Sequence, residues 1–150
     1  MINPKQIMYE EGRRNAEALR TEAASLTGTE IIARETDVPN FDPSKDYTGW
    51  PRGSAVADED QVWLLEIPHN ASHYPGTRPS SNRACWGLAH TTDPQKAKDW
   101  VSPYGTSGLY MEGECCTYKG HVWRNLYDRN EFPPMTLNVE NRWEDLGVTG

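Results

Sequence analysis

Aromatic rings flanked by amide side chains are the groups in this chain best suited to chemistry. Tyr127 is the clearest case, because Asn125 precedes it by two residues and Asn130 follows it by three. An exposed aromatic face can stack on the C–H face of a pyranose ring, and neighbouring amides can donate to and accept from its hydroxyl groups. This pattern suits the binding of a carbohydrate. The candidate ligand-binding residues are Asn70, Tyr74, Asn125, Tyr127, Asn130 and Phe132.

Two of these aromatic residues have a second interpretation. Tyr74 and Phe132 each directly precede a proline, in stretches without helical or strand periodicity. The favoured interpretation is that they fold down as a lid over the hydrophobic core. Four tryptophans are expected in the core itself, because each falls at a strand or closing position where a small β unit needs volume. They are Trp63, Trp86, Trp123 and Trp143.

No catalytic residues are expected. Glu112, Glu114 and Glu131 provide no pair with a spacing typical of acid–base catalysis. The sequence also contains no glycine-rich phosphate loop, nucleophile elbow or cysteine–histidine pairing. His69 and His73 are four residues apart, which suits a metal only on a helix, and the neighbouring prolines exclude that helix. We therefore expect a protein that is not an enzyme and that holds no metal and no cofactor.

The composition narrows the range of partners. With 15 Lys and Arg against 22 Asp and Glu, the formal net charge is −7, which argues against binding nucleic acid or an anionic membrane surface. No apolar run approaches the roughly 18 residues that span a bilayer, and the first residues, MINPKQIMYEEGRR, lack the apolar core of a secretory signal. Cys85, Cys115 and Cys116 show neither a disulfide framework nor a metal spacing. The adjacent pair Cys115 and Cys116 could form only an unusual vicinal disulfide. We expect instead reduced, half-buried thiols in a protein synthesised in a cytoplasm.

The chain repeats itself at an offset of sixty residues. Each copy then continues through a proline, Pro75 or Pro133, to a tryptophan near its end. Internal similarity at a fixed offset predicts two copies of one structural unit, here a small β unit rich in aromatic residues. A duplicated unit of this kind more often binds than catalyses. The matching positions are Trp50, Gly53, Val62, Trp63 and Asn70 in the first copy and Tyr110, Gly113, Val122, Trp123 and Asn130 in the second.

A helix is predicted before the repeat. Asn3 and Pro4 have the types preferred at the cap and at the first helical position, and Gly28 is expected to end the helix as a C-cap glycine. The helix either packs on the body of the same chain or joins copies of itself in a short bundle. Its apolar face, at helical spacing, consists of Met8, Gly12, Ala16, Leu19, Ala23 and Leu26.

The expected fold class is mainly β with an N-terminal α-helix, followed by two tandem small three-stranded β modules. Residues 1–40 form the helix and a linker, in which residues 29–35 are a short helix or strand. The first β module spans residues 41–90, the connector residues 91–99, and the second β module residues 100–150. In the connector, Asp93 and Pro94 are expected to open one helical turn.

Strand-like alternation places a hairpin in each module. Lys119-Gly120 is a favourable turn between residues 114–118 and 121–125. In the first module, where residues 54–56 and 61–65 are the matching strands, the tight turn is expected to be lost to Asp58-Glu59-Asp60.

The second module shows an ordered series of features: an aromatic residue, a glycine turn, two strands, a proline loop and a closing tryptophan. They lie at Tyr110, Gly113-Glu114, Cys116, Tyr118, Gly120, Val122-Trp123, Pro133 and Trp143. With this pattern the module resembles the family 5/12 carbohydrate-binding (chitin-binding) modules. The first module keeps Trp50, Gly53, Val56, Val62-Trp63, Pro75 or Pro79, and Trp86.

The resemblance implies a small β fold that binds polysaccharide without catalysis. Family modules present two adjacent aromatics just after the second strand, and the matching positions are Tyr127-Asp128 in the second module and Ile67-Pro68 in the first. The second module therefore keeps one platform aromatic and the first keeps neither.

Four short stretches carry a further resemblance: Leu19-Arg20, residues 28–32, residues 68–70 and residues 143–146. With these stretches, the order of elements in the chain is similar to that of small proteins encoded among tail genes of phages and prophages of Gram-positive gut bacteria. This implies a virion-associated accessory protein, made in the bacterial host cytoplasm. Its expected partners are host cell-surface polysaccharide, other virion proteins and copies of itself through the N-terminal helix. The alternative is a structural or decoration subunit of the virion that uses the same modules for protein–protein contacts.

Overall fold

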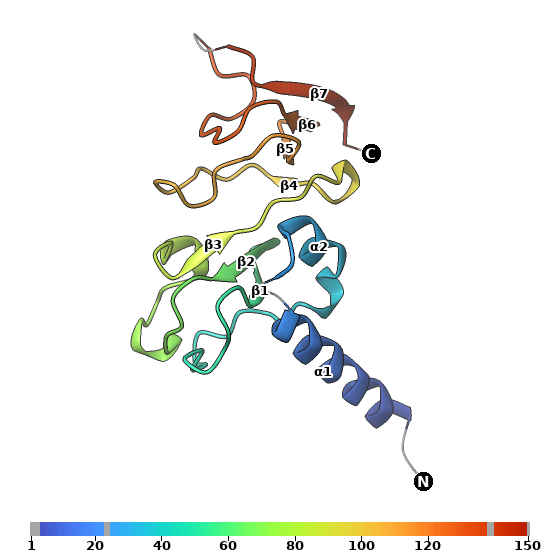
Figure 1. Ribbon diagram of the computed structural model, residues 1–150, viewed down its shortest axis with the longest axis vertical. Helices are drawn as coiled ribbons and strands as arrows, with labels where there is room; N and C mark the ends of the chain where they lie inside the picture. The colour runs from blue at the N-terminus through green and yellow to red at the C-terminus, as the bar shows by residue number, and fades with distance from the viewer. Residues whose placement is uncertain (1–3, 23–24, 138–139, 150) are drawn as a thin grey trace.

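Two small β-sheets follow a pair of N-terminal helices in the computed structural model, which describes residues 4–22, 25–137 and 140–149. The helices are α1 (Pro4–Glu22) and α2 (Gly28–Ala33). The first sheet holds β1 (Ala55–Asp58), β2 (Gln61–Leu65) and β3 (Trp86–Leu88), and the second holds β4 (Lys98–Asp99), β5 (Cys115–Tyr118), β6 (His121–Asn125) and β7 (Trp143–Val148). The second sheet follows the first along the long axis of the molecule (Figure 1). The expected fold class, mainly β with an N-terminal helix and two tandem β modules, is confirmed.

The two hairpins have the same register. Val56 lies opposite Trp63 in the antiparallel β1–β2 hairpin. Cys116 lies opposite Trp123 in the β5–β6 hairpin, sixty residues later. The closing strands β3 and β7 then pair antiparallel with β2 and β6, and each begins with its module's closing tryptophan. The sequence repeat is therefore a repeat of structure.

Each module also has a parallel neighbour for its first hairpin strand. β4 runs parallel to β5 with Asp99 opposite Thr117, and Asn40 forms a parallel bridge with Ala57 on β1. In both copies the following residue donates its N–H to the carbonyl of that strand residue, at 2.8 and 2.9 Å. The second sheet thus has one strand more than expected. The parallel pairing is a single bridge in the first module, but in the second module it extends over two residues, which form β4.

The structural counterpart of Tyr110 is Tyr47, whereas the fixed offset paired Tyr110 with Trp50. The Tyr47 hydroxyl accepts the N–H of Asp42 at 2.9 Å, and the Tyr110 hydroxyl accepts that of Val101 at 3.3 Å. Both tyrosines pack edge-on against their module's closing tryptophan with ring centroids 5.2 Å apart. The segment that leads to this tyrosine is longer in the second module, and the segment that follows it is longer in the first module. A constant offset of sixty residues therefore pairs Tyr110 with the wrong residue.

Both hairpins turn through two residues with left-handed backbone angles. Lys119 and Gly120 have φ of 49° and 79°, and Glu59 and Asp60 have φ of 52° and 61°. This geometry matches the twist of the strands that it joins. The prediction for Lys119-Gly120 is confirmed, and the prediction that the first module had lost its tight turn is wrong. In the first hairpin, Glu59 and Asp60 adopt the left-handed conformation, which glycine adopts more easily.

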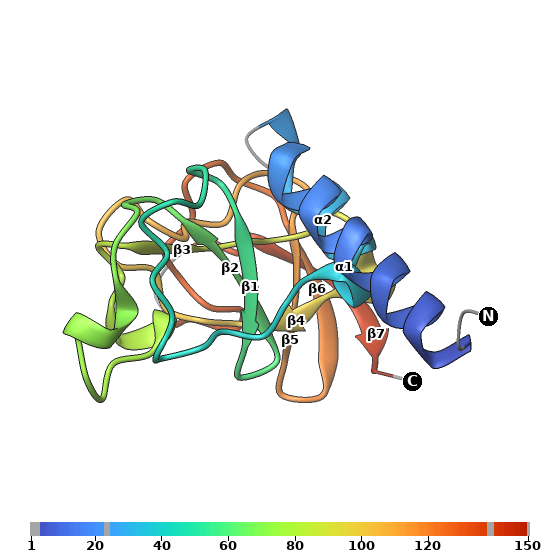
Figure 2. The same ribbon diagram turned by 90° about the horizontal axis from the view of Figure 1, so that it is seen from below.

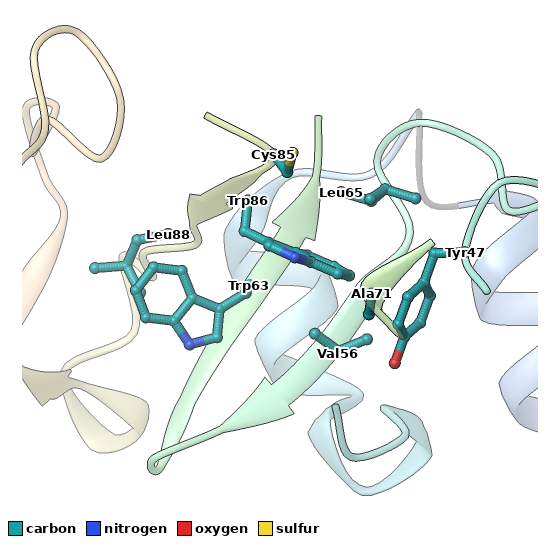
Figure 3. Packing of buried hydrophobic residues seen from close by; sticks show 8 residues of the cluster. All are labelled: Tyr47, Val56, Trp63, Leu65, Ala71, Cys85, Trp86 and Leu88. Carbon is teal, nitrogen blue, oxygen red and sulfur yellow. The ribbon is translucent and has the colours of Figure 1, made fainter. Parts of the chain in front are cut away.

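Large aromatic side chains build the module interiors. Trp63, Trp86 and Trp143 are buried as predicted, while Trp123 is half-buried. Figure 3 shows Trp86 near the centre of the first module's core. That core consists of Tyr47, Val56, Trp63, Leu65, Ala71, Cys85, Trp86 and Leu88.

The three cysteines are free and buried, rather than half-buried as expected. Burial raises the pKa of the Cys85, Cys115 and Cys116 thiols above its ordinary value. A raised pKa keeps these groups protonated, and the thiol is much less reactive than the thiolate.

The N-terminal segment forms two helices, and the short element expected over residues 29–35 is the helix α2. α1 ends at Glu22, and Gly28 begins α2 rather than capping α1. Thr27 caps α2 by accepting the N–H of Glu30, whose carboxylate accepts the N–H of Thr27 in return. Gly28 is needed because a Cβ there would collide with the carbonyl oxygen of His90. The predictions for Asn3, Ala23 and the side chain of Met8 lie outside the described residues.

α1 touches the rest of the molecule mainly near its C-terminal end. Leu19 is buried with Ile31, Ile32 and Val38, whereas residues 11–15 are exposed. α1 projects away from the sheets in Figure 1, and Figure 2 shows both helices on the same side of them. Among the described residues, no helix combines the length and apolar character needed to cross a membrane.

Candidate ligand-binding site

Tyr127 stands at the surface where β6 ends. Its side chain is 43% exposed, and the Arg142 guanidinium lies over its ring with the central carbon 5.7 Å from the ring centroid. The same guanidinium lies 5.1 Å from the centroid of Phe132, which is half-buried. A cation over an aromatic face is attracted by the ring's electrons. Tyr127, Arg142 and Phe132 therefore form one group of side chains, which we name the Tyr127 site.

Asn125 and Asn130 lie beneath this site and are fully buried. The Asn125 amide nitrogen donates to the carbonyl oxygens of Tyr110 at 2.9 Å and Tyr127 at 2.6 Å, and its oxygen accepts from the Asn130 amide nitrogen at 2.9 Å. The Asn130 oxygen in turn accepts the N–H of Phe132 at 3.0 Å. We correct the sequence-based assignment accordingly. These amides hold the backbone that carries the two aromatic rings, and they have no surface from which to reach a ligand.

In the first module, Asn70 and Tyr74 do not form a comparable group. The Asn70 side chain accepts the N–H of Ser72 at 3.0 Å, which caps a short 3-10 turn over residues 71–73. Tyr74 is 46% exposed and its ring meets the edge of His69 at 5.6 Å. Tyr74 is therefore a surface aromatic and not a lid, but no cation lies over it among the described residues.

The backbone shows which residues occupy the Tyr127 site's position in the first module. Leu126 donates its N–H to the carbonyl of Arg142, and Glu66 donates its N–H to the carbonyl of Cys85. Cys85, which is buried, is thus the counterpart of Arg142, and Ile67, 53% exposed, is the counterpart of Tyr127. Sequence reasoning missed Arg142, although its position just before the closing tryptophan was a usable signal. The combination of tyrosine and arginine belongs to the second module.

A cavity of about 300 Å³ adjoins the Tyr127 site. Phe132, Thr136, Asn141, Arg142 and Trp143 are among its lining residues. This volume is at the lower end of the range found for small-molecule sites. Within the described part of the chain, the Arg142 Nε atom is buried and has no hydrogen-bond partner. The site therefore offers an aromatic face, a cation and polar side chains around one hollow.

A second hollow, of about 420 Å³, lies where the two modules meet. Its lining includes Glu114, whose pKa is raised by burial and whose carboxylate accepts the N–H of Met111 at 2.6 Å. Its described lining holds no second carboxyl group, and a glycosidase-type mechanism needs two. The Glu114 carboxylate closes the turn before β5.

In the described ranges, no group of three or more His, Cys, Asp or Glu side chains could hold a metal ion. Comparison with known proteins adds no assignment: no protein-family model matches the chain, and no curated protein matches it in sequence.

Proposed function

We propose that this chain is a non-catalytic carbohydrate-binding protein whose second module binds a polysaccharide of a host cell surface through the Tyr127 site. The observation that carries the proposal is an exposed tyrosine whose backbone is fixed by two buried asparagines. A preorganised ring loses little freedom when a sugar stacks on it, so more of the interaction energy remains as affinity. The resemblance of the layout to phage tail proteins supports the further proposal that the chain is a virion-associated accessory protein.

The difference between the modules supports a division of labour. Both have the repeated strands and an aromatic core. Among the described residues, only the second has an aromatic ring just after its second hairpin strand, Tyr127, with a cation over it, which comes from Arg142 just before the closing strand. In the first module, exposed Ile67 offers no flat face at that position. The first module then serves to support the second and to dock the helices.

Retention on purified host peptidoglycan and on chitin tests this function. Tyr127→Ala is expected to weaken retention about tenfold, because a central aromatic contact contributes on the order of 1–2 kcal/mol. Ile67→Ala is the matched control at the equivalent exposed position and is expected to bind like the wild type. If the wild-type protein is retained on neither material, the glycan hypothesis is wrong. Equal losses in both variants would also contradict a role for Tyr127.

A virion structural role is the second candidate, and the protrusion of α1 favours it. Residues 11–15 on this helix are exposed, which leaves this stretch available to join another chain. In such a role the protein would be retained on tail particles with equal strength in the wild type and in Tyr127→Ala. The same two proteins, applied to glycan and to tail particles, therefore separate the two candidates.

A further inference from the structure

A third hollow, which we name the α1 cleft, lies between α1 and the chain that precedes β1. It has a volume of about 540 Å³. α1 contributes Arg13 and Arg20, and the segment before β1 contributes Asn40, Asp42, Lys45 and Trp50. These residues lie in the N-terminal half of the chain, whereas the Tyr127 site lies in the second module.

Three cations surround this cleft without carboxylate partners. The Arg20 guanidinium carbon lies 4.5 Å from the centroid of the Trp50 ring, and the Lys45 Nζ atom lies 5.3 Å from it. Across the described residues, Arg13, Arg20 and Lys45 form no ion pair within 4.0 Å. This concentration of positive charge stands out in a chain whose net charge is −7.

The one carboxylate in the cleft lining is engaged elsewhere. Asp42 accepts the N–H of Ser44 at 2.9 Å and its hydroxyl at 2.7 Å. These hydrogen bonds stabilise the carboxylate in a turn of its own segment. Besides the hydrogen bonds from Ser44, the Lys45 charge helps to lower the pKa of Asp42. Across the described residues neither Lys45 nor Arg13 forms an ion pair, so both remain available to an external anion.

The cleft is not part of the repeated fold. Gly53 follows Tyr47 by six residues, whereas Gly113 follows Tyr110 by only three. Trp50 lies in this longer stretch and contacts Arg20 on α1. The longer stretch thus adds Trp50 to one wall of the cleft, and α1 supplies the other wall.

We propose that the α1 cleft binds an anionic polysaccharide through its phosphate or carboxylate groups. Arg13 and Lys45, both exposed, pair with the anion, while Arg20 stacked on Trp50 holds the helix wall in place. A neutral glycan would leave Arg13 and Lys45 unpaired. A nucleic acid would require many more phosphate contacts than three cations can provide, and a membrane surface is held by larger basic clusters. The choice of polysaccharide over other anions rests on the proposed function.

Binding of soluble polymers by the full-length protein tests the proposal. The polymers are poly(glycerol phosphate), a polyuronate and a neutral chitin oligosaccharide, measured by calorimetric titration at low and at high salt. The wild type is expected to bind one of the anionic polymers and to lose affinity at high salt, because salt screens exposed charges. Comparing the phosphate polymer with the carboxylate polymer identifies which anion the cleft prefers.

Two charge-removing variants locate the binding. Arg13→Gln and Lys45→Gln are each expected to weaken binding roughly threefold to fivefold at low salt. Arg14→Gln is the matched control, because Arg14 is exposed on the same helix and does not line the cleft. Circular dichroism melting of each variant confirms that the fold is kept.

Three results would overturn the proposal: no preference of the wild type for an anionic polymer over the neutral one, an equal loss in Arg14→Gln, or tighter binding of a polyglutamate peptide than of either polymer. The neutral oligosaccharide with Tyr127→Ala tests the proposed function separately. A cleft-dependent anion signal without any effect of Tyr127→Ala would leave the inference standing and remove the Tyr127 site. The reverse result would remove the cleft alone.

Discussion

Asn125 illustrates how a single buried polar residue can set the geometry of a surface group of side chains. Its amide is fully buried and bonds to backbone or side-chain groups of Tyr110, Tyr127 and Asn130. Buried amides require such partners, because an unsatisfied one costs on the order of 1–3 kcal/mol. The interior network therefore fixes the backbone at Tyr127, whose side chain is exposed at the surface.

His90 is the residue whose titration should be visible in the stability of the fold. Its ring is stacked on Tyr110 with centroids 3.7 Å apart, and its Nε2 atom lies 2.8 Å from the Gly108 carbonyl oxygen. Burial lowers the pKa of His90 from 6.5 to about 4. Between these pH values His90 is protonated in the unfolded chain but neutral in the folded protein. The free energy of unfolding therefore falls as the pH drops through this window.

Unfolding by urea from pH 7 to pH 4 measures this effect. The wild type is expected to lose up to about 3 kcal/mol through His90, and His90→Gln, which cannot titrate, should lose correspondingly less. Glu114 acts in the opposite direction, since its raised pKa favours the folded state as pH falls. The difference between the two proteins isolates His90. His73→Gln, at an exposed histidine, is the control, and identical slopes for wild type and His90→Gln would contradict the assignment.

The two hairpin turns invite a comparison at the scale of the element. Asp60 and Gly120 occupy equivalent positions, with φ of 61° and 79°. A side chain in this conformation costs about 1 kcal/mol, less for Asp than for most residues. Asp60→Gly is therefore expected to raise the free energy of unfolding by about 0.5 kcal/mol, with glycine's greater freedom in the unfolded chain offsetting part of the gain. Gly120→Asp should lower it by about 1 kcal/mol.

Urea denaturation of the two variants beside the wild type checks this pair. Opposite signs are the essential result, because both substitutions alter only the turn. Changes of the same sign would show that contacts of the side chains, rather than backbone conformation, determine the stability of these turns.

The strands of both hairpins and the Lys119-Gly120 turn were predictable from sequence, because strand alternation and a favourable turn dipeptide are local signals. The tight Glu59-Asp60 turn was not, because neither residue favours left-handed backbone angles. The position of Tyr47 was not, since its match to Tyr110 depends on two loops whose lengths differ in compensating ways.

Gly28 was predicted to end a helix because glycine is common at helix C-caps, where its conformational freedom is needed. The actual reason is a close approach to His90, a residue far away in sequence. The burial of Asn125 was hidden for the same reason, because its partners are brought to it only by the fold.

At the scale of the whole molecule, the segment between the modules binds them together. The Cys115 N–H donates to the Thr91 carbonyl at 2.7 Å, and the Gln61 side chain donates to the Asp99 carbonyl at 3.0 Å. His90, which follows β3, stacks on Tyr110 in the core of the second module. Neither module can separate without breaking buried hydrogen bonds and exposing aromatic surface, so each depends on the other for part of its stability.

This mutual dependence predicts that the two modules unfold together. A small β module exposes too little apolar surface on unfolding to be very stable alone, and the junction adds contacts that both lose at once. Differential scanning calorimetry is therefore expected to show one transition, with a van't Hoff enthalpy equal to the calorimetric enthalpy. Loss of the His90–Tyr110 stack in His90→Ala should lower the midpoint temperature of unfolding. His69→Ala, at a buried histidine in the first module's own interior, should also lower this temperature without splitting the transition. Two resolved transitions in the wild type would mean that the repeated units are independent domains and that the junction contributes little.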